Sequence, residues 1–114
     1  MSADATPDHP SRLNPRDFAQ YSPDKMGKST IFKSDQMLVG LNAFEPGQEH
    51  EPHAHCDRDK IYVVLRGEGE ITIGEERSHV AVGDMALAPG GVVHSVRNTG
   101  TARLVLMVVM APPP

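Results

Sequence analysis

Cysteine is nearly absent from this chain, because Cys56 is the only one among 114 residues. No disulfide can form within the chain, which agrees with a reducing compartment. The sequence also lacks a long apolar run, since the longest, Leu104 to Ala111, is far too short to span a bilayer. Its start has no basic segment leading into an apolar one. We therefore expect a cytoplasmic protein without a membrane partner.

Positive charge is also scarce. The chain has 11 Lys and Arg against 15 Asp and Glu, a formal net charge of -4, and its basic residues form no block. Such a surface has no general attraction to phosphate backbones or to anionic lipids. Nucleic acid is therefore excluded as an expected partner.

Glycine and proline are plentiful by contrast, with 10 of each. A length of 114 residues predicts one domain, and the many turn residues favour short strands. Residues 1–27 hold prolines among polar residues, so they are predicted to form an N-terminal arm that is ordered only where it docks. Phe18 and Tyr21 are its expected docking contacts, because aromatic side chains bury the most apolar area. Residues 28–114 then form the β-barrel.

From Lys28 onward, short β-prone runs alternate with turn residues, which is the pattern of an all-β sandwich or barrel. We expect nine strands and no helix: Ser29–Lys33, Met37–Phe44, His50–His55, Lys60–Leu65, Gly69–Ile73, Arg77–Val82, Met85–Ala88, His94–Val96 and Arg103–Met110. The last strand is apolar on both faces, so it must be covered inside by the barrel and outside by a further layer. The N-terminal arm and a partner subunit are the candidates for that layer, and a symmetric homodimer is preferred.

Three of the six histidines have a spacing that indicates one site. His53 and His55 are two residues apart, so on one strand they point to the same face. A turn-bounded strand that carries His94 can bring a third imidazole beside them. Neutral imidazoles bind divalent transition metals such as iron, manganese, nickel, zinc and copper. The pattern predicts a three-histidine metal site with positions open to water or substrate.

The glycines and prolines around these histidines form two ordered motifs. The first runs Gly, five residues, His-x-His, four residues, a position for a carboxylate, six residues and Gly, and is met by Gly47, His53, His55, Lys60 and Gly67 except for the carboxylate. The second runs Gly, five residues, Pro-x-Gly, two residues, His, three residues and Asn, and is met in full by Gly83, Pro89, Gly91, His94 and Asn98. On these motifs the chain resembles the cupins, over roughly residues 37–110.

The resemblance implies an all-β double-stranded β-helix, or jelly roll, whose histidines face the barrel interior and whose cavity admits a small molecule. Cupins include dioxygenases, isomerases, epimerases, decarboxylases and proteins that only bind ligands, so the fold alone does not fix the function. The first hypothesis is a metal-dependent enzyme, dioxygenase-like or an isomerase, that acts on a small organic molecule. The second is a non-catalytic binding or sensing protein.

Lys60 departs from the family pattern, in which the matching residue usually supplies a carboxylate ligand. An ammonium about 4 Å from another unit positive charge is repelled by roughly 4 kcal/mol at an effective dielectric near 20, and a divalent ion would double this. The favoured outcome is that Lys60 turns away and pairs with Asp57, Asp59 or Glu49. The alternatives are a deprotonated lysine that acts as a base or Schiff-base amine, and a metal-free barrel that binds an organic acid. A rim lysine with its ammonium in water is the plain structural alternative.

Residues of matching strand parity are expected to line the cavity. Tyr62 and Val64 share a face with Lys60. Val96 shares one with His94. Core packing is their plain alternative, and both roles can hold at once.

Other polar residues near the motif histidines are assigned to the surface. His50 has the parity opposite to the paired histidines and is expected to face water. Glu49 and Glu51 are treated as loop acids, because Pro52 makes a regular strand doubtful. Cys56 is expected to be a free surface or loop thiol.

Overall fold

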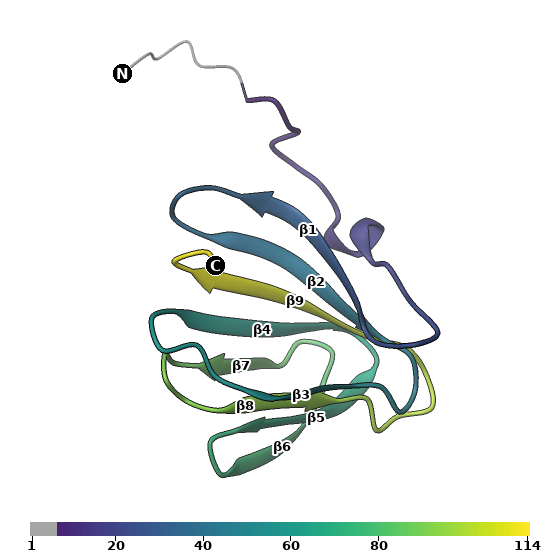
Figure 1. The fold of residues 1–114 in the computed structure, drawn as a ribbon. Coiled ribbons are helices and arrows are strands. Elements are labelled where there is room, and N and C mark those ends of the chain that lie inside the picture. The colour runs from purple at the N-terminus through teal and green to yellow at the C-terminus, as the bar shows by residue number, and fades with distance from the viewer. Residues whose placement is uncertain (1–6) are drawn as a thin grey trace.

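The structure is a computed structural model that describes residues 7–114. Two antiparallel β-sheets face each other, and an N-terminal segment lies outside them (Figure 1). The strands are β1 (Gly27–Lys33), β2 (Leu38–Phe44), β3 (Glu49–His53), β4 (Asp59–Arg66), β5 (Glu68–Ile73), β6 (Glu76–Ala81), β7 (Met85–Ala88), β8 (His94–Arg97) and β9 (Leu104–Ala111). One 3₁₀ helix, η1 (Pro15–Phe18), precedes them. No helix of the described residues is long and apolar enough to cross a membrane.

The strand order explains how distant parts of the sequence meet. The five-stranded sheet has the order β1-β2-β9-β4-β7, and the four-stranded sheet has the order β3-β8-β5-β6. Strands far apart in sequence, such as β2 and β9, are therefore neighbours, as in a jelly roll. The predicted all-β fold is confirmed, and each predicted strand is present with its ends shifted by no more than two residues.

The space between the sheets holds the main hydrophobic core. Its buried members are Met26, Phe44, Tyr62, Val64, Ile71, Val80, Val96, Leu104, Leu106 and Val108. Along β4, every second side chain from Lys60 to Val64 is buried, whereas those between them are partly exposed. This alternation decides which side chains β4 presents to the interior.

Strand β9 is covered on both faces, as its apolar sequence predicts. Leu104 and Leu106 are 0% exposed in the main core, and Val105 between them is 1% exposed on the outer face. The residues packed around it there include Leu41, Ala43, Phe18, Ala19 and Tyr21. The arm therefore supplies part of the outer layer, and Phe18 and Tyr21 dock as predicted.

The helix η1 shapes the arm and lies before residue 28, from which point no helix was expected. Asn14 precedes it, and the Asn14 side chain accepts a hydrogen bond of 3.1 Å from the backbone N–H of Arg16. Pro15 occupies the first helical position, where a missing N–H costs nothing. Four residues are too few for a helical period to show in a sequence, so the Asn-Pro start was the only available signal.

Tyr21 then anchors the arm to the larger sheet. The guanidinium carbon of Arg103 lies 4.0 Å from the centroid of the Tyr21 ring, a cation–π contact. Arg66, at the end of β4, donates a hydrogen bond of 3.2 Å to the Tyr21 hydroxyl. The arm is thus fixed at the start of β9 and at the end of β4.

Asn98, the asparagine of the second motif, joins two segments of the chain. It is 1% exposed, and its amide donates to the carbonyls of Phe44 at 3.1 Å and Ala102 at 2.9 Å. Its side-chain oxygen accepts a hydrogen bond of 3.0 Å from the N–H of Gly100. One side chain therefore holds the end of β2 against the connection between β8 and β9.

We expect Asn98→Ala to lower the free energy of unfolding by roughly 2–4 kcal/mol, because buried backbone groups lose their partners. Urea denaturation measures this change. Thr99→Ala, at the exposed neighbouring position, is the control and should change the value by less than about 0.5 kcal/mol. Equal stability of Asn98→Ala and the wild type would contradict this role.

Candidate metal centre

The adjacent strands β3 and β8 place two histidines opposite each other. His53 and His94 are partners in the antiparallel register, and partner residues point to the same face of a sheet. Their ring centroids are 4.1 Å apart. His94 is 2% exposed, so the shared face is the barrel interior.

His55 lies just beyond the end of β3 and completes the group. Its backbone carbonyl accepts a hydrogen bond of 2.8 Å from the N–H of Gly91. Gly91 has a φ of 84°, a conformation that favours glycine, so this turn ties His55 to the strand that carries His94. The His55 ring centroid is 5.3 Å from that of His53 and 5.9 Å from that of His94. The structure therefore brings together the three histidines predicted from their spacing.

Backbone carbonyls fix the tautomers of the two strand histidines. The Nδ1 atom of His53 lies 2.8 Å from the carbonyl oxygen of Glu51, and that of His94 lies 3.0 Å from the carbonyl oxygen of Val92. A carbonyl oxygen only accepts, so each Nδ1 carries the hydrogen and each Nε2 keeps its lone pair. Both Nε2 atoms are buried and have no hydrogen-bond partner within residues 7–114. This is the arrangement of a metal-binding histidine, oriented from behind by a carbonyl.

The three imidazoles form a donor set that fits a transition-metal ion. Bonds of about 2.1 Å to imidazole nitrogens bring three ligand atoms to roughly 3–3.5 Å from one another. Here the three candidate ligand atoms lie within 4.8 Å of one another, so one ring has to move inward by about 1–2 Å. The His55 ring lies outside the strand, and its centroid is the most distant from the other two.

The same imidazoles are neutral at pH 7. Burial lowers the pKa of His53, His55 and His94 below the ordinary value of 6.5. The positive charge of Lys60 lowers all three pKa values further. Neutral imidazole is the form that binds metals.

His50 also faces the interior, so the prediction that it lies at the surface was wrong. It pairs with Val96, while His53 pairs with His94, so three steps along β3 match two along β8. This β-bulge contains Pro52 and reverses the parity of the strand. The His50 and His53 ring centroids are 4.0 Å apart. Burial and, second, the neighbouring His53 lower the pKa of His50 to about 3.

Lys60 points into the barrel, and the favoured prediction that it turns away was wrong. It is 4% exposed, and its Nζ lies 4.8 Å from the centroid of the Tyr62 ring. Strand alternation is the reason, since it puts both residues on the inner face of β4. Asp57 pairs with Arg58 instead, and Asp59 accepts a backbone hydrogen bond. In the described part of the chain, no carboxylate forms a salt bridge with Lys60.

The acids and the thiol near the histidines stay outside the group. Glu49 and Glu51 are exposed although they belong to β3. Cys56 is an exposed free thiol, as predicted. The one cluster of metal-ligating residue types found within residues 7–114 consists of the three histidines alone.

The three residues expected to line the cavity are all buried in the main core. The ring centroid of Tyr62 is 6.1 Å from that of His94. Its hydroxyl is buried and has no hydrogen-bond partner among the described residues. Burial raises the pKa of Tyr62, so its hydroxyl stays protonated and can donate. Contact of Tyr62, Val64 and Val96 with a ligand stays a prediction.

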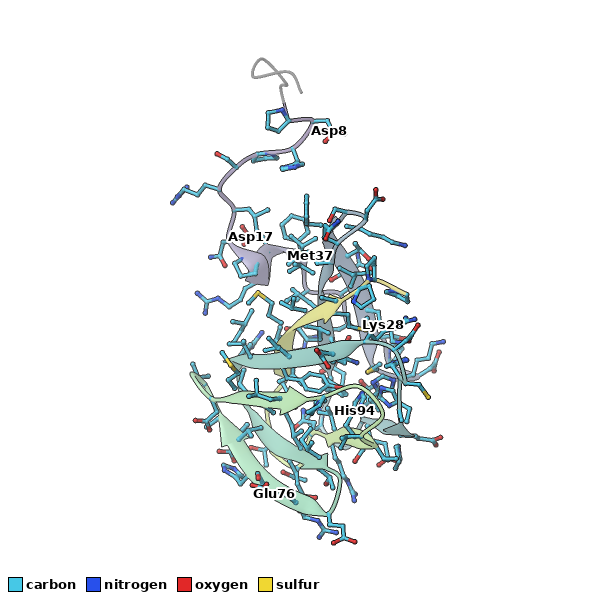
Figure 2. All side chains as sticks on the ribbon, turned by 90° about the vertical axis from the view of Figure 1, so that its left-hand side faces the viewer. Asp8, Asp17, Lys28, Met37, Glu76 and His94 are labelled. Carbon is cyan, nitrogen blue, oxygen red and sulfur yellow. The ribbon has the colours of Figure 1, made fainter. Side chains whose placement is uncertain are left out.

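Two hollows share Lys28 in their lining, and histidines line only the larger one. The larger, about 630 Å³, is lined by Lys25, Met26, Lys28, Glu49, His50, Glu51, Pro52 and His53. The smaller, about 220 Å³, is lined by residues that include Lys28, Leu38, Asn42, Lys60, Val108 and Met110. Lys28 borders both, and Figure 2 shows it at the same end of the barrel as His94. The sequence did not indicate Lys28 as a site residue. Lys28 on β1 is the cross-strand partner of the buried Asn42 on β2, and this pairing is visible only in the structure.

Comparisons with known proteins agree with this architecture. The family model described as "Cupin domain" matches residues 40–110. An uncharacterized protein of Streptomyces coelicolor is 37% identical over 85 residues, which are 73% of this chain and 77% of that protein. The solved structure of TT1209 from Thermus thermophilus is 41% identical and has a TM-score of 0.87, over 90% of this chain and 98% of that one. A protein of Klebsiella pneumoniae with a double-stranded β-helix domain is 26% identical, with a TM-score of 0.85 over 91% of each chain.

We expect Lys60→Met to stabilise the metal-free protein at pH 7. Burial lowers the pKa of Lys60 from 10.5 to about 8. At roughly 1.4 kcal/mol per pKa unit, the charged lysine destabilises the fold by about 3 kcal/mol. The variant removes this cost and keeps a side chain of similar length.

The expected gain depends on pH with a definite sign. Below pH 8 Lys60 is charged in both the folded and the unfolded state, so the full gain is present. Between pH 8 and 10.5 only the folded state loses the proton, so the gain shrinks, and above pH 10.5 it vanishes. Urea denaturation at several pH values measures it, with Lys33→Met at an exposed site as the control. A Lys60→Met protein no more stable than the wild type at pH 7 would overturn the expectation.

Proposed function

Since the chain belongs to the cupin family, we propose that it is a small metalloprotein that holds a divalent transition-metal ion on His53, His55 and His94. The supporting observation is the pair of buried Nε2 atoms on His53 and His94, which have no partner among the described residues. Buried polar atoms of this kind cost stability unless they bind something. Iron, manganese, nickel, zinc and copper all suit imidazole nitrogen.

Three neutral ligands leave coordination positions open to a small organic molecule. When bound, an ion such as iron supplies oxygen activation, and zinc supplies Lewis-acid chemistry. The chain's own residues orient the imidazoles, and the apolar core beside Tyr62 excludes water from their inner side. The proposed activity is a dioxygenase-like oxidation of a small organic molecule, with an isomerase as the other enzyme class. We place it in the cytoplasm, where the exposed Cys56 stays reduced.

A second candidate function is a metal-free binding or sensing protein. The buried side chain of Lys60 supports it, because its ammonium lies 4.8 Å from the centroid of the Tyr62 ring, beside His94, and opposes a cation among the imidazoles. In this form, Lys60 itself would hold the ligand. Metal content separates the two candidates.

We expect protein purified without a histidine tag to bind about one zinc ion per chain, as measured by equilibrium dialysis and elemental analysis. The double variant His53→Ala/His94→Ala should bind none, because it removes both oriented Nε2 atoms. His79→Ala is the matched control, since His79 is exposed on β6 and should leave zinc binding unchanged. Equal zinc content in the wild type and the double variant would mean that the metal site is wrong.

We also propose a homodimer, formed through the outer face of the larger sheet. Two rows of apolar side chains cross β7, β4 and β9 there: Leu87, Ile61 and Val109 in one row, and Met85, Val63 and Met107 in the other. Leu87 is 58% and Met85 60% exposed. The arm packs against a different part of this face, around Leu41 and Val105. The four residues on β4 and β9 are half-buried, and a continuous apolar patch of this kind is typical of a protein interface.

Light scattering at micromolar concentration should give about twice the chain mass of 12.4 kDa. Leu87→Glu should yield a monomer, because it puts a charge in the middle of the proposed contact. Val82→Glu is the control, since Val82 is 65% exposed but precedes β7 and lies outside the two rows. A wild-type mass of 12.4 kDa would rule out the dimer under these conditions.

A further inference from the structure

The wall that faces the histidines carries positive charge without an acidic partner. Lys60 is 4% exposed, its Nζ lies 4.8 Å from the centroid of the Tyr62 ring, and that centroid lies 6.1 Å from the centroid of His94. Lys28 borders the same 220 Å³ hollow and acts on Lys60 through its own charge. The buried hydroxyl of Tyr62 is a third donor without a partner among the described residues.

The neighbouring acids do not neutralise this wall. Asp59 accepts a hydrogen bond of 2.8 Å from the N–H of Gly90, and Asp57 forms its ion pair with Arg58. Glu49 and Glu51 border the larger hollow, but both are exposed. A buried ammonium without a counter-ion is a binding site for an anion.

We propose that the barrel binds a small organic acid, whose carboxylate accepts a hydrogen bond from Lys60 and lies between it and the histidines. The inference deepens the proposed function and rests on it, because it names the ligand class of the same site. A carboxylate in this place also offsets the positive charge that Lys60 and a divalent ion would otherwise bring together. Lys28 borders the same hollow as Lys60 and adds a second positive charge there.

The lining of the smaller hollow favours an organic acid over an inorganic anion. Leu38, Val108 and Met110 border it together with Lys60. An apolar wall beside two lysines matches a ligand with a hydrocarbon part and a carboxylate. Inorganic phosphate would meet the charge but would leave the apolar wall without a partner.

Butyrate is the probe, with butyramide as its neutral analogue and inorganic phosphate as the inorganic anion. Titrations followed by the amide signals of isotope-labelled protein give dissociation constants for the metal-free and the zinc-loaded forms. Butyrate should bind saturably, and butyramide and phosphate should each bind at least about tenfold more weakly, because they lack the charge or the apolar part. Butyramide or phosphate binding as tightly as butyrate would overturn the proposal, and so would the absence of saturable butyrate binding in both forms.

Lys60→Met should weaken butyrate binding at least about tenfold, since a charge-assisted hydrogen bond is lost. Lys33→Met removes the same charge from an exposed site that borders neither hollow, and should leave the affinity unchanged. Lys28→Met, at an exposed position, gives a second test that does not alter the core, with an expected loss of about threefold. Wild-type affinity for butyrate in both Lys60→Met and Lys28→Met would overturn the proposal.

Zinc binding, measured separately, distinguishes this inference from the proposed function. Zinc binding without butyrate binding overturns the organic-acid ligand and leaves the metal site intact. Butyrate binding that depends on Lys60, in a protein that binds no zinc, overturns the metal site and supports the acid as the ligand of a metal-free barrel.

Discussion

The bulge in β3 is the constraint on which the site depends. A regular strand with period two would send His50 and His53 to opposite faces. The extra residue in β3 lets His50 pair with Val96 and His53 with His94, so both imidazoles enter the barrel. His50 and His53 pack on each other there. The Nδ1 atoms of His53 and His94 contact backbone carbonyls, and their Nε2 atoms have no partner among the described residues. The interior thus gains nitrogen donors without gaining charge, since burial keeps these imidazoles neutral.

The positive charge of Lys60 opposes the binding of a metal ion by these imidazoles. Its ammonium is buried on the facing wall by the same alternation that buries Tyr62 and Val64. A metal ion and this ammonium repel each other, whereas an organic anion attracts both. Binding of the ion and binding of the anion are therefore coupled, and by linkage each strengthens the other to the same extent. Such a coupling would allow a barrel with a lysine at the carboxylate position to hold the proposed metal ion.

The sequence predicted the strands and the three histidines well, because both follow from local rules. Turn residues mark the strand ends, and the spacing of His53, His55 and His94 within two turn-bounded motifs implies one cluster. The failures lie where tertiary pairing overrides local parity. His50 was predicted to face water because a bulge depends on the pairing with the partner strand, which the sequence of β3 does not show. Lys60 was predicted to turn outward to an acidic partner, whereas the alternation of side chains along β4 turns it inward. Lys28 was missed since only the β1–β2 register shows that it borders the hollow.

The two faces of β4 connect the proposed site with the proposed dimer. Inward, the strand presents Lys60 and Tyr62 to the histidines; outward, it presents Ile61 and Val63 between the exposed residues of β7 and those of β9. The arm covers only the part of the outer face near Val105, so β7, an edge strand, would remain wet on its apolar side in a monomer. A partner subunit that covers these rows would stiffen the strand that carries Lys60. The proposed dimer contact would therefore help to hold the Lys60 ammonium in place, although it involves the opposite face of β4 from the one toward the ligand.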